Sequence, residues 1–317
     1  MHEYELSVDT GGHRLSGTVC LPAPAGRYPV VLMLHGSGPL DRDENMRGQR
    51  LDVFNTIAHR LAASGIASVR YDKRGCGKST GVYSNASHSD FVHDALAWVD
   101  RLASAPFSAG GITLLGHSEG TVVAPRVAVE RAEVRALVLL CPTVTDFETV
   151  LMRQAEQIEG ELTRLPGLQG KLLRFYTRLT GSPVASQRKL LARIRASTTP
   201  TLRIGLRTLE AAWLRELLQL EIAPLLAAVR CPMLVVAAAK DIQCDPEDAQ
   251  RIAAQNPLAE AHVIEDLTHI LRRDTRPASL FGYQQLLAQP VDSQLLELIA
   301  GWLERQPARD ELTQNTT

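Results

Sequence analysis

The chain has 317 residues, of which 45% are apolar and 22% are charged, so it can bury a large core without disulfides or metal ions. Its 34 basic and 35 acidic residues leave a formal net charge of −1, which argues against partners such as nucleic acid or an anionic membrane surface. The five cysteines are widely spaced and form no C-x-x-C pair, so neither a disulfide framework nor a zinc site is expected. The N-terminus lacks the pattern of a secretory signal, and we therefore expect a cytoplasmic protein.

The first half of the chain alternates short apolar runs with helical patterns. Residues 4–8 and 15–21 flank Gly11-Gly12 and predict a β-hairpin. Strands are then expected over 30–34, 66–71, 112–115 and 136–140, and helices over 51–64, 91–102 and 121–130. Strands that are apolar on both sides and alternate with helices are typical of a parallel sheet covered on both faces. The sequence therefore predicts a doubly wound, mostly parallel α/β sheet that begins with a hairpin.

The alternation stops between residues 143 and 229, where apolar residues recur at helical spacing. It resumes with strands over 231–239 and 261–265 and helices over 246–254 and 295–303. We therefore expect one core domain built from residues 1–142 and 230–306, interrupted by a helical insertion over 143–229. The polar residues 307–317 are expected to form a flexible tail.

A nucleophile motif follows the strand predicted over 112–115. Gly116-His117-Ser118-Glu119-Gly120 matches G-x-S-x-G and leads into a predicted helix. A serine on such a sharp strand-to-helix turn projects above the sheet, and the flanking glycines remove side chains that would clash there. We identify Ser118 as the candidate nucleophile.

A serine hydroxyl needs a base within hydrogen-bond reach, and that base needs an orienting acid. Asp241 and His269 each come just after a predicted strand, and the order Ser118, Asp241, His269 fits the motif. His269 is the candidate base and Asp241 the candidate acid. Two other residues are alternatives for the orienting acid. They are Asp245, which could instead cap a helix, and Asp146, which follows another strand.

Backbone N–H groups must also receive the negative oxygen of a tetrahedral intermediate. The glycine-rich run His35-Gly36-Ser37-Gly38-Pro39 follows the strand over 30–34, where such donors are needed. The candidate donors are the N–H groups of Ser37 and Glu119, with Gly38 as the near alternative.

Together these patches resemble the α/β-hydrolase superfamily, and within it the bacterial serine esterases similar to dienelactone hydrolases and acylaminoacyl-peptidase-like enzymes. The matching patches are the Ser37 loop with Asp41-Arg42-Asp43-Glu44 behind it, residues 72–79, the Ser118 motif and the loops of Asp241 and His269. The resemblance implies that the insertion over 143–229 forms a cap that filters substrates and that 72–79 is a structural turn. One departure is that Ala239-Lys240, not glycine, precedes Asp241.

No cofactor or metal motif is recognisable. Gly77-Lys78-Ser79 ends like a phosphate-binding loop, but Asp72 stands where that motif requires its first glycine. The run from Asp41 to Glu44 has two interpretations: a solvated loop whose charges pair with one another, or groups that orient substrate or hold the cap.

The residues predict a serine hydrolase that cleaves a carboxylic ester or thioester of a small molecule through an acyl-enzyme. A peptidase of the acylaminoacyl or dipeptidyl type is the alternative within the same chemistry. A catalytically silent module that binds a ligand under the cap is the alternative from another class. Apolar residues of the insertion could face the pocket or a second subunit, which leaves a homodimer open.

Overall fold

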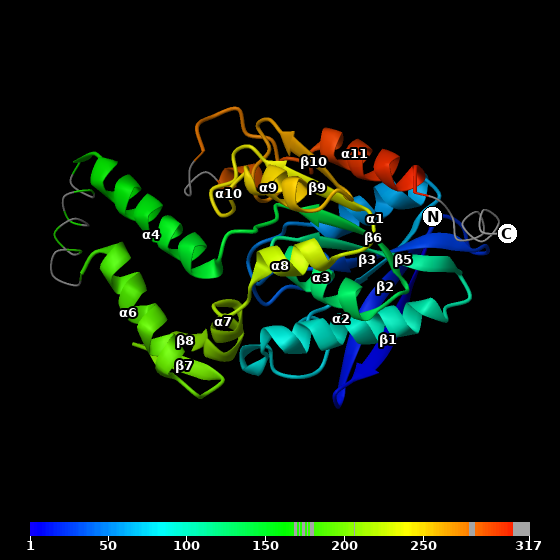
Figure 1. The fold of residues 1–317 in the computed structure, drawn as a ribbon, viewed down its shortest axis with the longest axis horizontal. Helices are drawn as coiled ribbons and strands as arrows, with labels where there is room; N and C mark the ends of the chain where they lie inside the picture. The colour runs from blue at the N-terminus through cyan, green and yellow to red at the C-terminus, as the bar shows by residue number, and fades with distance from the viewer. Residues whose placement is uncertain are drawn as a thin grey trace.

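The central sheet of this protein has eight strands in the order β1-β2-β4-β3-β5-β6-β9-β10 (Figure 1). The computed structural model describes residues 1–306 except 168–169, 171, 173–174, 176, 178–180, 206 and 279–282. The strands are β1 His2–Thr10, β2 His13–Leu21, β3 Tyr28–Leu34, β4 Ala67–Tyr71, β5 Ser108–His117, β6 Val134–Leu140, β9 Met233–Ala238 and β10 Ala259–Ile264. β1 and β2 form the predicted antiparallel hairpin. The other six strands of this sheet, which are β3, β4, β5, β6, β9 and β10, run parallel to one another. The doubly wound α/β prediction is confirmed.

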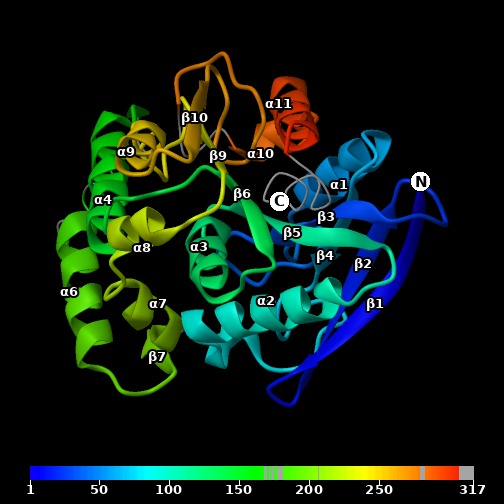
Figure 2. The same cartoon turned by 45° about the vertical axis from the view of Figure 1, so that its right-hand side comes forward.

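Helices cover both faces of this sheet (Figure 2). One face packs against α1 and α11, and the opposite face packs against α2, α3, α8 and α9. Successive residues of β3 alternate between the two layers, with Leu32 in one core and Met33 in the other. The bounds of these helices are α1 Val53–Ala63, α2 His88–Ala103, α3 Gly120–Glu130, α8 Ile222–Ala228, α9 Asp248–Gln255 and α11 Ser293–Glu304.

The insertion between β6 and β9 extends away from the sheet (Figure 1). Its elements are α4 Phe147–Arg164, α6 Pro183–Ala196, β7 Thr201–Ile204, β8 Arg207–Glu210, α7 Ala211–Leu217 and α8. The antiparallel pair β7–β8 corrects the expectation of a purely helical insertion. Its four-residue strands are too short to show a clear alternation in the sequence, and Gly205 with φ of 60° turns the chain between them.

α8 belongs to the core packing although it lies within the insertion, because Ile222 and Leu226 are buried with residues of α3 and α9. The tail expected over 307–317 lies outside the described residues. Over the described part of the chain, every helix is too short or too polar to span a lipid bilayer.

Candidate active site

Ser118 lies in the sharp turn between β5, which ends at His117, and α3, which begins at Gly120. Its φ of 51° is in the left-handed region, which non-glycine residues adopt at a cost of about 1 to 3 kcal/mol. A Cβ on Gly116 would lie 2.2 Å from the carbonyl oxygen of Gly120, and one on Gly120 would lie 2.0 Å from that of Leu34. The two glycines of the motif are therefore required by the close approach of the backbone.

The structure brings Ser118, His269 and Asp241 into one line of hydrogen bonds. His269 Nε2 lies 3.0 Å from Ser118 Oγ, and His269 Nδ1 lies 2.7 Å from Asp241 Oδ2. The other carboxylate oxygen of Asp241 accepts the backbone N–H groups of Gln243 at 2.7 Å and Cys244 at 2.9 Å. Burial raises the pKa of Asp241, but the charge and hydrogen bonds of these partners outweigh it and lower the pKa below its ordinary value. Asp241 is therefore held as a carboxylate.

The two alternative acids have other partners. Asp146 caps α4 by accepting the N–H of Thr149 at 2.8 Å. Asp245 pairs with Arg153 at 3.0 Å and with Arg251 at 3.1 Å. Only Asp241 of these three carboxylates is recorded within hydrogen-bond distance of the His269 ring in the part of the chain that the structure describes.

The candidate oxyanion donors lie around Ser118. Ser37 and Glu119 line the same cavity as Ser118. A Cβ on Gly36 would lie 3.3 Å from the Cβ of Ser118, so the first loop approaches the serine closely. Gly38 has φ of 113°, which only glycine adopts readily. The backbone N–H groups of Ser37 and Glu119 therefore stay the candidate oxyanion donors, and the N–H of Gly38 stays the neighbouring alternative.

A buried ion pair behind the serine was not anticipated from the sequence. Glu44 is 1% exposed, and its carboxylate accepts the N–H of Gly36 at 2.7 Å and faces His117 Nδ1 at 2.8 Å. His117 Nε2 in turn lies 2.9 Å from the backbone carbonyl of His269. Glu44 is therefore buried and pairs outside the run from Asp41 to Glu44, which corrects, for this residue, the interpretation of a solvated loop whose charges pair with one another. It links the Gly36 loop to the His269 loop.

The geometry also defines the protonation state of His117. Both of its ring nitrogens face acceptors, a carboxylate and a carbonyl, so both must carry hydrogen. Burial lowers the pKa of His117, but the charge of Glu44 outweighs it and raises the pKa above its ordinary value. Burial likewise raises the pKa of Glu44, and His117 with the Gly36 N–H brings it below its ordinary value. An imidazolium and a carboxylate are thus paired inside the protein.

A second buried cluster surrounds the side chain of Glu119. Lys73 Nζ lies 2.9 Å from the Glu119 carboxylate and donates to the carbonyl of Gly36 at 2.7 Å. The other carboxylate oxygen of Glu119 accepts a hydrogen bond from Nε1 of Trp213 in α7 of the insertion. Lys73 belongs to the turn over 72–79, so that turn supports both loops that carry the candidate oxyanion donors. The tryptophan joins them to the insertion.

Little in the sequence pointed to these clusters. The one usable signal was a charged residue at each variable position of the elbow, His117 and Glu119, between residues that must be buried. Such charges need buried partners. The partners themselves stand between 46 and 152 residues away in the chain, which no local pattern reveals.

Metal-ligating side chains do meet beside His269. Atoms of Cys141, Asp241 and His269 lie within 4.8 Å of one another. Burial raises the pKa of the Cys141 thiol well above its ordinary value, which keeps it protonated and a poor ligand. The carboxylate and the imidazole already bind each other, so this cluster suits proton transfer better than metal binding.

A cavity of about 340 Å³ opens onto Ser118. Its wall consists largely of apolar side chains supplied by the insertion. These are Phe147, Val150, Leu151, Leu190, Leu209, Trp213, Leu214 and Leu217. The site therefore presents the candidate nucleophile and the candidate base to a mainly apolar chamber.

The sheet is mostly parallel, helices cover both of its faces, and a strained serine turn follows a central strand. These features define a protein of the α/β-hydrolase class. The family described as serine aminopeptidase, S33 (Hydrolase_4) matches residues 47–276, and the chain belongs to this family.

Relatives and solved structures give the same fold. Esterase EstD of Thermotoga maritima is 24% identical over 292 residues, which are 91% of this chain and 65% of EstD. The chain thus spans less than two thirds of that relative's length. Est1E of Butyrivibrio proteoclasticus with bound ferulic acid superposes with a TM-score of 0.63 at 18% identity, over 95% of this chain and 98% of that chain. The Pyrococcus furiosus esterase Pf2001 gives a TM-score of 0.58 at 17% identity, over 96% of this chain and 92% of that one.

Proposed function

We propose that the protein hydrolyses a carboxylic ester, or a thioester, through an acyl-enzyme formed on Ser118. The observation that carries the proposal is the hydrogen-bonded line from Ser118 through His269 to Asp241 at the mouth of an apolar cavity. The esterase names of EstD, Est1E and Pf2001 agree with it.

In this mechanism Ser118 Oγ attacks the acyl carbon while His269 Nε2 takes the hydroxyl proton. Asp241 holds the other ring nitrogen as a donor and stabilises the imidazolium that forms. The N–H groups of Ser37 and Glu119 receive the oxyanion. The alcohol leaves with the proton from His269, and water, activated by the same imidazole, then releases the acid.

An aminopeptidase activity is the second candidate, because the family carries that description. Recognition of a free amino terminus needs a carboxylate in the cavity. Among the described residues that line the cavity at Ser118, Glu119 is the one carboxylate, and Lys73 and Trp213 already bind it. The chamber therefore favours a neutral ester over a charged aminoacyl substrate.

The insertion supplies the walls of the chamber, and we infer that it selects the substrate. We also infer a reducing, cytoplasmic location, because all five cysteines, which lie among the described residues, are unpaired.

The test is turnover of p-nitrophenyl acetate by the wild type and by Ser118→Ala. We expect the variant to lose about 10⁶ in kcat while keeping its fold by circular dichroism. Ser104→Ala, an exposed serine at the end of α2, is the matched control and should behave as the wild type. A fluorophosphonate should add once to the wild type, on Ser118.

Wild-type turnover retained by Ser118→Ala would refute the mechanism. Aminoacyl p-nitroanilide cleavage without ester cleavage would move the assignment to the peptidase. A ligand that protects the fold but is never consumed would identify a binding module.

A further inference from the structure

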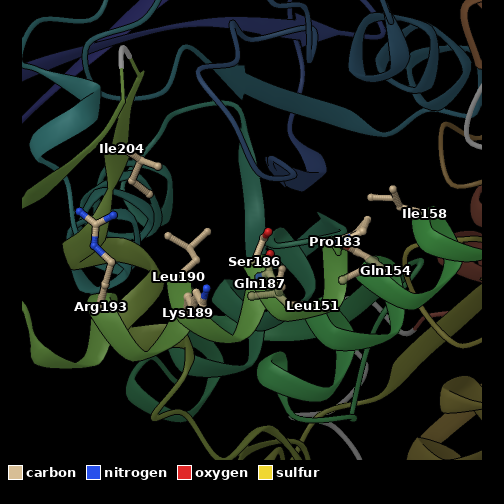
Figure 3. Close-up of a pocket in the computed structure, with 11 residues that line it drawn as sticks. Leu151, Gln154, Ile158, Pro183, Ser186, Gln187, Lys189, Leu190, Arg193 and Ile204 are labelled. Carbon is tan, nitrogen blue, oxygen red and sulfur yellow. The ribbon is translucent and has the colours of Figure 1, made fainter. Parts of the chain in front are cut away.

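A second cavity of about 490 Å³ lies between α4 and α6 of the insertion (Figure 3). Most of its surface is formed by aliphatic side chains of those two helices and of β7. The residues are Leu151, Gln154, Ala155, Ile158, Pro183, Ser186, Gln187, Lys189, Leu190, Arg193 and Ile204. We call it the distal groove.

The distal groove adjoins the cavity at Ser118. Four residues line both: Leu151 and Gln154 of α4, and Gln187 and Leu190 of α6. Along α4 the lining residues follow one another at helical spacing, from Phe147 at the catalytic cavity to Ile158 in the groove. Those eleven steps span about 16 Å at 1.5 Å per residue, so the linings of the two cavities together extend about 16 Å along α4 from the serine.

Apolar side chains of the groove wall are exposed to solvent. Ile158 is 41% exposed, and Leu190 is partly exposed. Lys189 and Arg193 are exposed residues of the groove lining, and the Arg193 guanidinium donates to the carbonyl of Arg203 in β7 at 3.1 Å. An aliphatic occupant would remove the exposed apolar surface of Ile158 and Leu190 from water.

We propose that the distal groove is a second subsite of the active centre and binds an extended aliphatic arm of the ester. The proposal rests on the proposed ester hydrolysis and adds the class of substrate. The arm begins at the ester carbon held by Ser118, passes Leu151 and Leu190, and ends against Ile158.

The test compares p-nitrophenyl esters of straight-chain acids from two to sixteen carbons, and acetate esters of straight-chain alcohols over the same range. Each methylene that becomes buried should raise kcat/KM by about twofold to fourfold. We expect this rise to continue past the length that the catalytic cavity alone accommodates. If kcat/KM rises with length in the acid series, the arm is the acyl group. If it rises in the alcohol series, the arm is the alcohol group.

Two variants alter the distal groove without touching the catalytic cavity. Ser186→Trp fills the groove and Ile158→Asp makes its wall charged, since both residues line the groove and neither lines the cavity at Ser118. We expect each to lower the ratio of long-ester to short-ester kcat/KM by tenfold or more. The matched controls are Ala192→Trp on the exposed side of α6 and Val129→Asp, an exposed apolar residue of α3, and both should keep the wild-type ratio.

Binding of straight-chain carboxylates to Ser118→Ala, measured by calorimetry, separates this proposal from the proposed function. Chain-length-dependent binding that Ile158→Asp abolishes would support the groove even if no ester were hydrolysed. Short-ester turnover with an unchanged ratio in both groove variants would overturn the groove and leave the proposed function standing. A change of association state in Ser186→Trp by sedimentation, with an unchanged ratio, would instead assign the groove to a second copy of the chain.

Discussion

The carboxylate of Asp241 accepts hydrogen bonds on both oxygens, and this determines what an amide would do in its place. Its Oδ1 accepts the N–H groups of Gln243 and Cys244, while its Oδ2 faces His269 Nδ1. In Asp241→Asn the amide oxygen would stay with the two N–H donors, so the NH₂ group would point at His269. His269 would then carry its proton on Nε2 and could not accept the proton of Ser118.

We therefore expect Asp241→Asn to lower kcat for the ester by about 10⁴ without unfolding the protein. The measurement is steady-state turnover with a thermal melt of each variant. Asp245→Asn, in the same loop but paired with Arg153 and Arg251, is the matched control. A comparable loss in Asp245→Asn would mean that the acid has been assigned to the wrong residue.

The Glu44–His117 pair should make stability depend on pH. The pKa of His117 is raised in the folded protein, so its contribution is full below about pH 6.5 and disappears as the pH rises through the folded value. The pKa of Glu44 is lowered, so its contribution is full above about pH 4.3 and disappears as the pH falls through the folded value. The pair stabilises the fold most between those two limits.

Glu44→Gln leaves the buried imidazolium without its counter-ion and should cost about 3 kcal/mol of unfolding free energy near pH 6. The difference from the wild type should shrink as the pH rises through the raised pKa of His117. Urea denaturation over a pH series measures it. Glu260→Gln, which removes the partner of the half-exposed His262, should change stability by less than about 1 kcal/mol. A difference that grew with rising pH would show that His117 is neutral.

At the scale of elements, Lys73 connects the loop after β3 with the start of α3. The carbonyl of Gly36 and the N–H of Ser37 belong to one planar trans peptide and point in opposite directions. Because Lys73 holds the carbonyl, it also holds the direction of the Ser37 N–H. The same ammonium pairs with Glu119, whose backbone is the other candidate donor.

Lys73→Met should therefore act on the transition state more than on substrate binding. We expect kcat to fall by about tenfold to 10²-fold, below the full loss of an oxyanion donor, with a much smaller change in KM. Lys78→Met, an exposed lysine of the same turn, should keep both constants. A folded Lys73→Met with wild-type kcat, or a rise in KM alone, would contradict this positioning role.

At the scale of the whole molecule, Trp213 ties the insertion to the core. Its indole N–H donates to Glu119, and its ring lies 6.0 Å from that of Phe147 in an edge-to-face arrangement. The core and the insertion thus meet at the residue next to the nucleophile. A change in the insertion can reach the catalytic turn through one hydrogen bond.

Trp213→Phe keeps most of the ring but removes the donor, and should lower the unfolding free energy by about 1 to 2 kcal/mol. Amides of α7 should exchange with solvent faster, as measured by hydrogen exchange and mass spectrometry. Amides of α11, on the other face of the sheet, serve as the internal control. Unchanged exchange in α7 would show that other contacts hold the insertion.

The sequence predicted the sheet and the grouping of Ser118, Asp241 and His269 for one reason. Each of these residues follows a parallel strand, and the carboxyl ends of parallel strands meet at one edge of a sheet. Glu44 and Lys73 lie in loops, where no period exists to read, and Trp213 lies in α7, whose helical period does not reveal a partner in the core. The β7–β8 hairpin was missed because its strands are short and lie among helix-forming residues.

The linear pattern thus determined the fold class, the position of the serine turn and the strand ends that bring its partners together, because these follow from local geometry and hydrophobic periodicity. Only the tertiary structure decided which carboxylate faces His269, that His117 is an imidazolium, and that Lys73 joins both oxyanion loops. Those outcomes depend on contacts between residues distant in the chain, whose distances and burial arise only when the whole sheet and the insertion pack together.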